Sequence, residues 1–446
     1  MKKIFFAAAL IFACSAAFAA DKGDIAIIED VDGTIVSSFT GLNLSKAACA
    51  LYKDHQDIYD AIIIFYSGKL PLMFNTPSGY AVKAAQKGIG RDPAVDMTKQ
   101  YCAANSRLKH SMNMAEIDGY PADPDDYYTK AVDGVYTGIE VIAHEFGHYW
   151  LALPMFKQDG NMHCYLRAFM NSSEPKTGDC DGYAYSEFGL HWSYLFNARS
   201  PMFGSFIDDL GDGTFKIYSE HPKYSPFDQY LMGLRSPESV PAMFVVNTGN
   251  YEKANNTPLP PGESEIVEGE RIDFTVQDVI AAMGERVPPR DPCHWKAAFV
   301  IVHPKGSPPS NAQVSRVDAY RQRWETFYDW ATDNKGSADT TINGRGTGTG
   351  GCPGSPTYPD GGVVPDGSSD SGAKDAAFAD AGFHDSGAPD GGTKDSGITD
   401  GGTSTDSGAT DASVEDDAQI ADSGTDASGP GPVNPVVGCS CSAIML

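Results

Sequence analysis

The chain has 446 residues, of which 59 are Asp or Glu and 33 are Lys or Arg, so its formal net charge is −26. A surface this acidic repels phosphate groups, which excludes proteins that bind nucleic acids or anionic membranes through counterion release. With 41% hydrophobic and 11% aromatic residues, the chain still has enough apolar side chains for a core, which excludes disorder throughout.

The first residues have the features of a secretory signal. Lys2 and Lys3 precede an apolar run over residues 4–13, and small residues follow. This order is typical of a signal peptide, and we expect residues 1–19 to be removed. Cys14 leaves a lipoprotein site as an alternative, although the bulky residue two positions earlier argues against it. Because no later run reaches the length of a transmembrane helix, we expect an exported chain that is secreted or displayed at the cell surface.

Residues 20–354 form the predicted folded body. Its first part alternates two kinds of pattern: buried strands at 25–28 and 61–66, with a helix at 45–54 between them. Strands and helices interleaved in this way favour an α+β fold, which we expect to form two packed lobes.

Six cysteines lie in this body, and in an exported protein they predict disulfide bonds. Sequence does not choose among the 15 pairings that six cysteines allow. The pairing of Cys164 with Cys180, which closes a short loop, is the first to test. None has C-x-x-C spacing, which disfavours a zinc site with cysteine ligands. The six are Cys49, Cys102, Cys164, Cys180, Cys293 and Cys352.

Residues 144–148 read H-E-F-G-H and match the H-E-x-x-H pattern. The context is helical, because Thr137 and Glu140 form a capping box upstream and apolar residues follow at helical spacing. Pro154 predicts the end of the helix.

On such a helix His144 and His148 lie one turn apart on one face, where both imidazoles reach a single Zn²⁺. Glu145 lies on the adjacent edge and is placed to accept a proton from a metal-activated water. The alternative is a buried amphipathic helix with two hydrogen-bonded histidines and no metal.

The third metal ligand has two candidates, because no histidine follows at H-x-x-G-x-x-H spacing and no N-E-x-x-x-D helix is present. We prefer Asp228 and keep His191 as the alternative, with Tyr230 as a group that stabilises the oxyanion. Asp228 also fits a capping role, in which Ser225 is the N-cap, Pro226 the first helical residue and Asp228 the third. A carboxylate in a first turn can nevertheless face a metal, so both roles stay open.

Several other polar residues are weaker candidates. The segment 208–213 is similar to a calcium loop but lacks required oxygen ligands, so we expect a tight turn there. Four residues are expected at the surface: His163, Glu174, Glu187 and His221.

Two further helices are predicted by capping boxes that begin at Thr275 and Ser310. Gly284 can close the first. The second has apolar residues at helical spacing: Val314, Val317, Trp324, Phe327 and Ala331.

Composition changes sharply after the body. Residues 355–446 contain 15 Asp, one Glu and two Lys, a net charge of −14, and Asp recurs every five residues over 370–400. We expect residues 355–432 to be a disordered, self-repelling spacer, because they cannot bury enough apolar surface to offset the entropy of ordering. A calcium-binding repeat is the alternative, but the apolar strand position of such repeats is missing.

The motifs H-E-x-x-H-x-W at 144–150, H-W-S at 191–193 and S-P-x-D-x-Y-L-M-G-L at 225–234 together resemble secreted zincin-type metallopeptidases of delta-proteobacteria. The resemblance covers most of residues 60–345 and implies a zincin-like body built around an active-site helix. The last motif is also similar to the Asp-bearing segment of aspzincins, although their Tyr-Gly pair is displaced here.

The end of the chain resembles a second element. Gly438-Cys439-Ser440-Cys441 is similar to the myxobacterial C-terminal sorting signal, but the hydrophobic helix and basic cluster of that signal are absent. The resemblance implies that residues 433–446 are a remnant of it, with cell-surface attachment through Cys439 or Cys441.

The expected function is therefore a secreted or surface-displayed zinc endopeptidase that acts on a protein or glycoprotein. The alternative is a non-catalytic surface adhesin or binding module on the same scaffold. A hydrolase of a non-peptide amide is a third hypothesis.

Overall fold

The computed structural model describes residues 21–343, apart from 38–40, 92–93, 104–106, 131–134, 164, 170–187 and 250. The predictions for the signal peptide, the acidic spacer and the C-terminal cysteines lie outside these residues. The described helices are α1 (Leu44–Asp54), α2 (Gly138–Gly147), α3 (Pro226–Leu231), α4 (Val276–Met283) and α5 (Asn311–Ala331), with short 3-10 helices η1 (Leu72–Phe74), η2 (Ile117–Gly119), η5 (Pro237–Ser239) and η6 (Tyr251–Asn255).

A mostly parallel sheet forms the centre of the described region. Four strands run parallel, and a fifth is antiparallel at the edge. Their order across the sheet is β1 (Ile25–Asp30), β18 (His294–Pro304), β4 (Ala61–Tyr66), β8 (His110–Glu116) and β5 (Ser78–Ala81), and β19 (Ser337–Asp339) pairs with the first part of β18.

The remaining described strands form small sheets and hairpins. They are β13 (Phe206–Gly211) and β14 (Thr214–Tyr218) with β16 (Ser264–Glu268), β15 (Met243–Asn247) with β17 (Glu270–Phe274), β9 (Phe156–Gln158) with β10 (Asn161–His163), β11 (Arg167–Phe169) with β12 (Phe188–Trp192), β2 (Val36–Ser37) with β3 (Gly41–Leu42), and β6 (Lys83–Ala84) with β7 (Val95–Asp96). The fold is thus mixed α+β.

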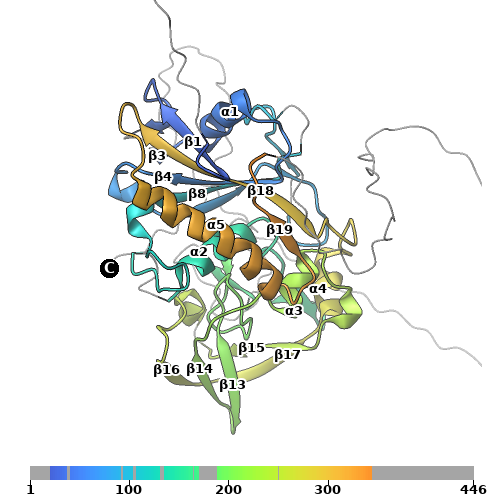
Figure 1. Cartoon of the computed structure of the whole chain (residues 1–446). Helices are drawn as coiled ribbons and strands as arrows, with labels where there is room; N and C mark the ends of the chain where they lie inside the picture. The colour runs from blue at the N-terminus through green and yellow to red at the C-terminus, as the bar shows by residue number, and fades with distance from the viewer. Residues whose placement is uncertain are drawn as a thin grey trace, which may run out of the picture. The chain divides into compact units, whose positions relative to one another are not determined.

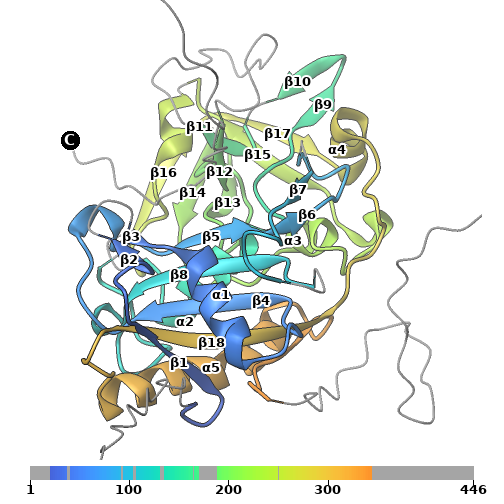
Figure 2. The same cartoon turned by 90° about the horizontal axis from the view of Figure 1, so that it is seen from above.

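Helices cover both faces of the central sheet. Every residue of β4 is buried, as expected for a parallel strand with a helix layer on each side. One set of alternate residues in β1, β4 and β18 packs against α1, and the other set packs against α2 and α5. Figure 1 shows α2 and α5 on the same side of the sheet. In Figure 2 α1 lies over the strands. The hairpin β13–β14 and strands β15 and β16 share a third, smaller core.

Most local predictions for the body are confirmed. The two early strands are β1 and β4, and the early helix is α1. The capping boxes at Thr275 and Ser310 begin α4 and α5, and Gly284 is the C-cap of α4. Within the segment 208–213, Asp212 and Gly213 form the predicted tight turn of the β13–β14 hairpin, whereas residues 208–211 belong to β13.

The prediction of disulfides is confirmed for one pair. Cys49 in α1 is bonded to Cys102, across 53 residues of sequence. Cys293 is disulfide-bonded as well. Cys164 and Cys180 lie outside the described residues, so their pairing stays a prediction. None of the helices in the described part combines the length and apolar composition needed to cross a membrane.

Candidate metal centre

Helix α2 presents the motif histidines. The predicted capping box is present: the Thr137 N–H donates to Glu140 Oε2 at 2.8 Å, and the Glu140 N–H donates to Thr137 Oγ1 at 3.4 Å. The helix ends at Gly147, earlier than Pro154 predicts, because the next turn tightens into bonds to the third residue back. His148 is the C-cap and keeps a right-handed helical backbone (φ −56°, ψ −13°), so it still follows His144 by one turn.

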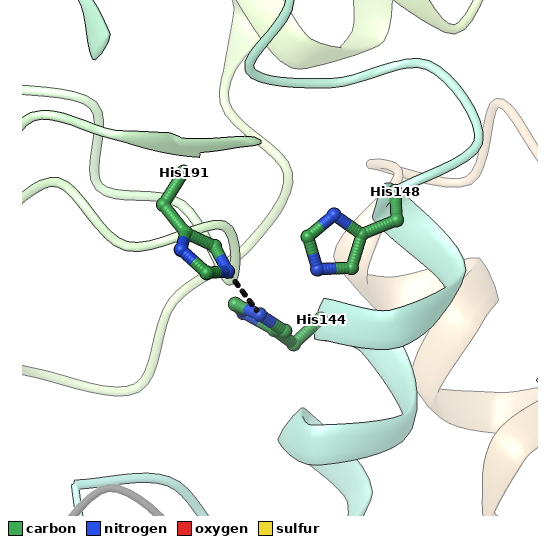
Figure 3. Close-up of side chains that lie close together, drawn as sticks. All are labelled: His144, His148 and His191. Atoms are coloured by element: carbon green, nitrogen blue, oxygen red, sulfur yellow. Dashed lines mark hydrogen bonds between the residues drawn. The ribbon is translucent and has the colours of Figure 1, made fainter. Parts of the chain in front are cut away.

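A third histidine completes the cluster. His191 comes from β12, and Figure 3 shows its ring facing His144 and His148. The Nε2 atoms of His144 and His191 are 3.1 Å apart, and one nitrogen from each of the three rings lies within 4.8 Å of the others. Two imidazoles bound to one tetrahedral Zn²⁺ place their nitrogens about 3.3 Å apart. The three side chains therefore lie close enough to hold a metal ion.

The protein surroundings favour the neutral form of these rings. Burial lowers the pKa of His144 to about 4, and the backbone carbonyl of Pro201 opposes that shift only in part. Burial also holds the pKa of His148 and of His191 well below the usual value, with repulsion between the neighbouring rings as a further cause. A neutral imidazole is the species that binds metals, so the three rings need not lose protons at neutral pH to do so.

Contacts around His144 fix which nitrogen faces the cluster. Its Nδ1 is 2.7 Å from the carbonyl oxygen of Pro201, which can only accept, so Nδ1 carries the proton and Nε2 has the lone pair. The Phe203 ring packs against His144 and His191, with centroid distances of 4.9 and 4.4 Å. Phe203 has φ of 71°, in the left-handed region, and its N–H donates to the Tyr136 hydroxyl at 3.1 Å. Packing and backbone bonding thus hold these rings in place.

Glu145 is a buried carboxyl beside the cluster. Its Oε2 lies 3.8 Å from His148 Nε2, and that oxygen has no hydrogen-bond partner in the described region. Burial raises the pKa of Glu145 to about 8, while a hydrogen bond from the backbone of Gly79 acts in the opposite direction. An orphaned carboxylate oxygen next to three neutral imidazoles fits a centre completed by a cation and a water, so the donor set suits Zn²⁺.

Gly79 allows the edge strand β5 to approach α2. A Cβ added there would lie 2.2 Å from the Glu145 carbonyl oxygen, which is backbone and cannot move aside. We expect Gly79→Ala to lower the free energy of unfolding by about 1–3 kcal/mol, as overpacking of a tight core does. Denaturant unfolding measures this loss. Gly119→Ala is the matched control, since its Cβ would lie no closer than 3.2 Å to any neighbour. Equal stability of the two variants would contradict the close approach.

Asp228 is not part of this group, so the geometry favours His191 over the preferred Asp228 as the third ligand. It is the third residue of α3, and its Oδ2 accepts from the Ser225 N–H at 2.8 Å, as the capping alternative predicts. Its Oδ1 accepts from Trp192 Nε1 at 2.9 Å. Both oxygens are thus occupied by protein donors, and the group of potential ligands among the described residues contains His191 instead.

The other sequence candidates are dispersed. Tyr230 is buried on α3, with its hydroxyl near the backbone of Arg286. His221 is exposed and pairs with Glu140 at 2.8 Å, and His163 stacks on Phe156 in the β9–β10 hairpin. The remaining two, Glu174 and Glu187, lie outside the described residues.

Three residues that shape the centre were not predicted: Gly79, Pro201 and Phe203. A glycine within a strand is a signal of close backbone approach, which could have identified Gly79. The other two act through a carbonyl group and a packed ring, for which the sequence carries no signal. Comparison with protein-family models, with curated proteins and with solved structures finds no match for the chain. The function is therefore inferred from the residues and the geometry of this centre.

Proposed function

We propose that the chain is an exported, zinc-dependent endopeptidase with a zincin-like body. The observation that carries the proposal is the buried cluster of His144, His148 and His191, with the Glu145 carboxyl beside it. Three neutral imidazoles leave a fourth position of a tetrahedral zinc ion for water or substrate, which is the arrangement of catalytic zinc sites.

The residues of the chain divide the chemistry between them. His144, His148 and His191 would hold the ion, and when bound it would polarise the scissile carbonyl and acidify a water. Glu145 would accept a proton from the attacking water and deliver it to the leaving nitrogen. The Glu145 carboxyl lies 3.8 Å from His148 Nε2, which places it beside the position that the ion would take.

The position of the edge strand β5 favours a peptide as the substrate. No other strand in the described part of the chain pairs with its outer edge. Its Gly79 backbone bonds to the Glu145 carboxyl, so the strand passes directly beside the proposed base. An extended peptide can add to such an edge through main-chain hydrogen bonds, which would bring its carbonyls to the centre.

A non-catalytic binding module on the same scaffold is the second candidate. The burial of the centre favours it, because Glu145 is only 2% exposed and His148 only 6%. A metal in such surroundings can be purely structural. Hydrolysis of a non-peptide amide is a third hypothesis, because the same chemistry could act on such a bond.

Metal removal tests the proposal. We expect the purified chain to contain about one zinc per molecule and to cleave an unfolded protein such as casein. Incubation with 1,10-phenanthroline should abolish cleavage, and added Zn²⁺ should restore it. The 1,7-isomer, which does not chelate, is the control. One zinc per chain without cleavage of proteins, glycoproteins or small amides would favour the binding module, and no bound metal would overturn both.

A further inference from the structure

Asp228 is a fully buried carboxyl that joins three segments of the chain. It is 0% exposed. Besides the bonds from Trp192 and Ser225, its carboxylate accepts a hydrogen bond from the side chain of Ser200. A carboxylate without water contact needs several donors, and here they come from β12, from the start of α3 and from the loop after residue 198.

One of these bonds leads to His191. Trp192 follows His191 in β12, and its indole N–H donates to Asp228 Oδ1 at 2.9 Å. The Trp192 backbone N–H donates to the Met202 carbonyl at 2.9 Å. Since Trp192 is held at both its side chain and its backbone, the direction of the neighbouring His191 side chain is fixed as well.

Another bond leads to His144. Ser200 accepts the Met202 N–H on Oγ at 3.0 Å, which fixes the turn around Pro201. The carbonyl oxygen of Pro201 is the one that accepts from His144 Nδ1 at 2.7 Å. The contact between Ser200 and Asp228 thus anchors the turn that orients His144.

We propose that Asp228 is a positioning residue of the metal centre: through Trp192 and Ser200 it sets the geometry of His191 and His144 relative to each other. The inference rests on the metal site of the proposed function. A capping role accounts for the bond from Ser225, but it does not account for the bonds from Trp192 and Ser200. Trp192 is the neighbour of His191, and Ser200 precedes Pro201, whose carbonyl oxygen accepts from His144, which ties the carboxylate to the centre.

The test compares Asp228→Ala with Asp278→Ala. Asp278 has the same position in the capping box of α4, where its Oδ2 accepts from the Thr275 N–H at 2.7 Å, and α4 packs against β9 and η5. Both variants lose a capping carboxylate. The readouts are the dissociation constant for Co²⁺, the visible absorption band of the bound Co²⁺, and the denaturant midpoint of the metal-free protein.

We expect Asp228→Ala to weaken Co²⁺ binding about 10–100-fold and to change the absorption band, as the loss of a residue that orients ligands does. Asp278→Ala should lower the denaturant midpoint but bind Co²⁺ as the wild type does. Unchanged affinity and spectrum in Asp228→Ala would overturn the inference. If the wild type itself binds no Co²⁺, both the metal site and the inference fail. If the wild type binds Co²⁺ and Asp228→Ala binds it equally well, only the inference fails, so the two failures are distinguishable.

Two milder variants cover the case in which Asp228→Ala does not fold. Trp192→Phe removes the indole donor and keeps an aromatic ring, and Ser200→Ala removes only a hydroxyl. Each breaks one connection to the carboxylate. We expect each to weaken Co²⁺ binding several-fold and to change the absorption band, whereas wild-type affinity in both would overturn the inference.

Discussion

The Glu145→Gln variant is expected to retain its zinc and to lose peptide hydrolysis, with kcat reduced by at least about 10²–10⁴-fold. Glutamine has nearly the shape of glutamate, and its carbonyl oxygen can still accept the bond from the Gly79 backbone. The amide cannot take a proton from water at neutral pH. Initial rates of casein cleavage, measured beside zinc content by atomic emission, separate the chemical loss from a loss of metal.

Glu140→Gln is the matched control for this variant. Glu140 lies on the same helix and is also buried, but its carboxylate bonds to Thr137 and His221, neither of which belongs to the histidine cluster. We expect this variant to cleave casein at close to the wild-type rate. Cleavage by Glu145→Gln at the rate of Glu140→Gln would remove Glu145 from the mechanism and leave the histidine cluster without a base.

The sequence predicted the local elements of the centre because their determinants are local. A capping box needs residues only three positions apart, and the boxes at the starts of α2, α3, α4 and α5 are all present. Helical spacing likewise placed His144 and His148 on one face. The continuous apolar run of β4 predicted a strand buried on both faces.

The order of the strands was not predictable in the same way. β18 lies between β1 and β4, so a strand near the end of the body separates two strands from its beginning. Parallel pairing over more than 200 residues leaves no periodic pattern in either strand. Such pairings depend on which faces the whole body must bury, and that is set by contacts distant in sequence.

The sequence favoured Asp228 over His191, whereas the geometry favours His191, for a related reason. Both residues stand in polar-aromatic segments, and a carboxylate in a first helical turn can serve either a cap or a metal. The deciding fact is the bond from Trp192 to Asp228, which crosses 36 residues and joins two elements that no local pattern pairs. The capping role was predictable, but the indole that occupies the other oxygen was not.

The His191→Ala variant is expected to bind zinc more than about 100-fold more weakly than the wild type. This loss is larger than the one expected from removing a residue that only orients a ligand. The substitution removes one of three nitrogens in the cluster, and His144 and His148 alone make an incomplete site. Competition with a chromogenic chelator measures the affinity. Casein cleavage should be lost at low zinc concentrations.

His221→Ala is the control, because His221 is also a histidine but pairs with Glu140 at the surface, and its zinc affinity should equal that of the wild type. His191→Asp supplies a carboxylate oxygen at the same place and should recover part of the lost affinity, which a purely structural role of His191 would not give. Zinc binding by His191→Ala with wild-type affinity would contradict the assignment. The order of two losses is itself diagnostic: if His191 is a ligand and Asp228 positions it, His191→Ala must weaken zinc binding more than Asp228→Ala, whereas the reverse order would make Asp228 the ligand.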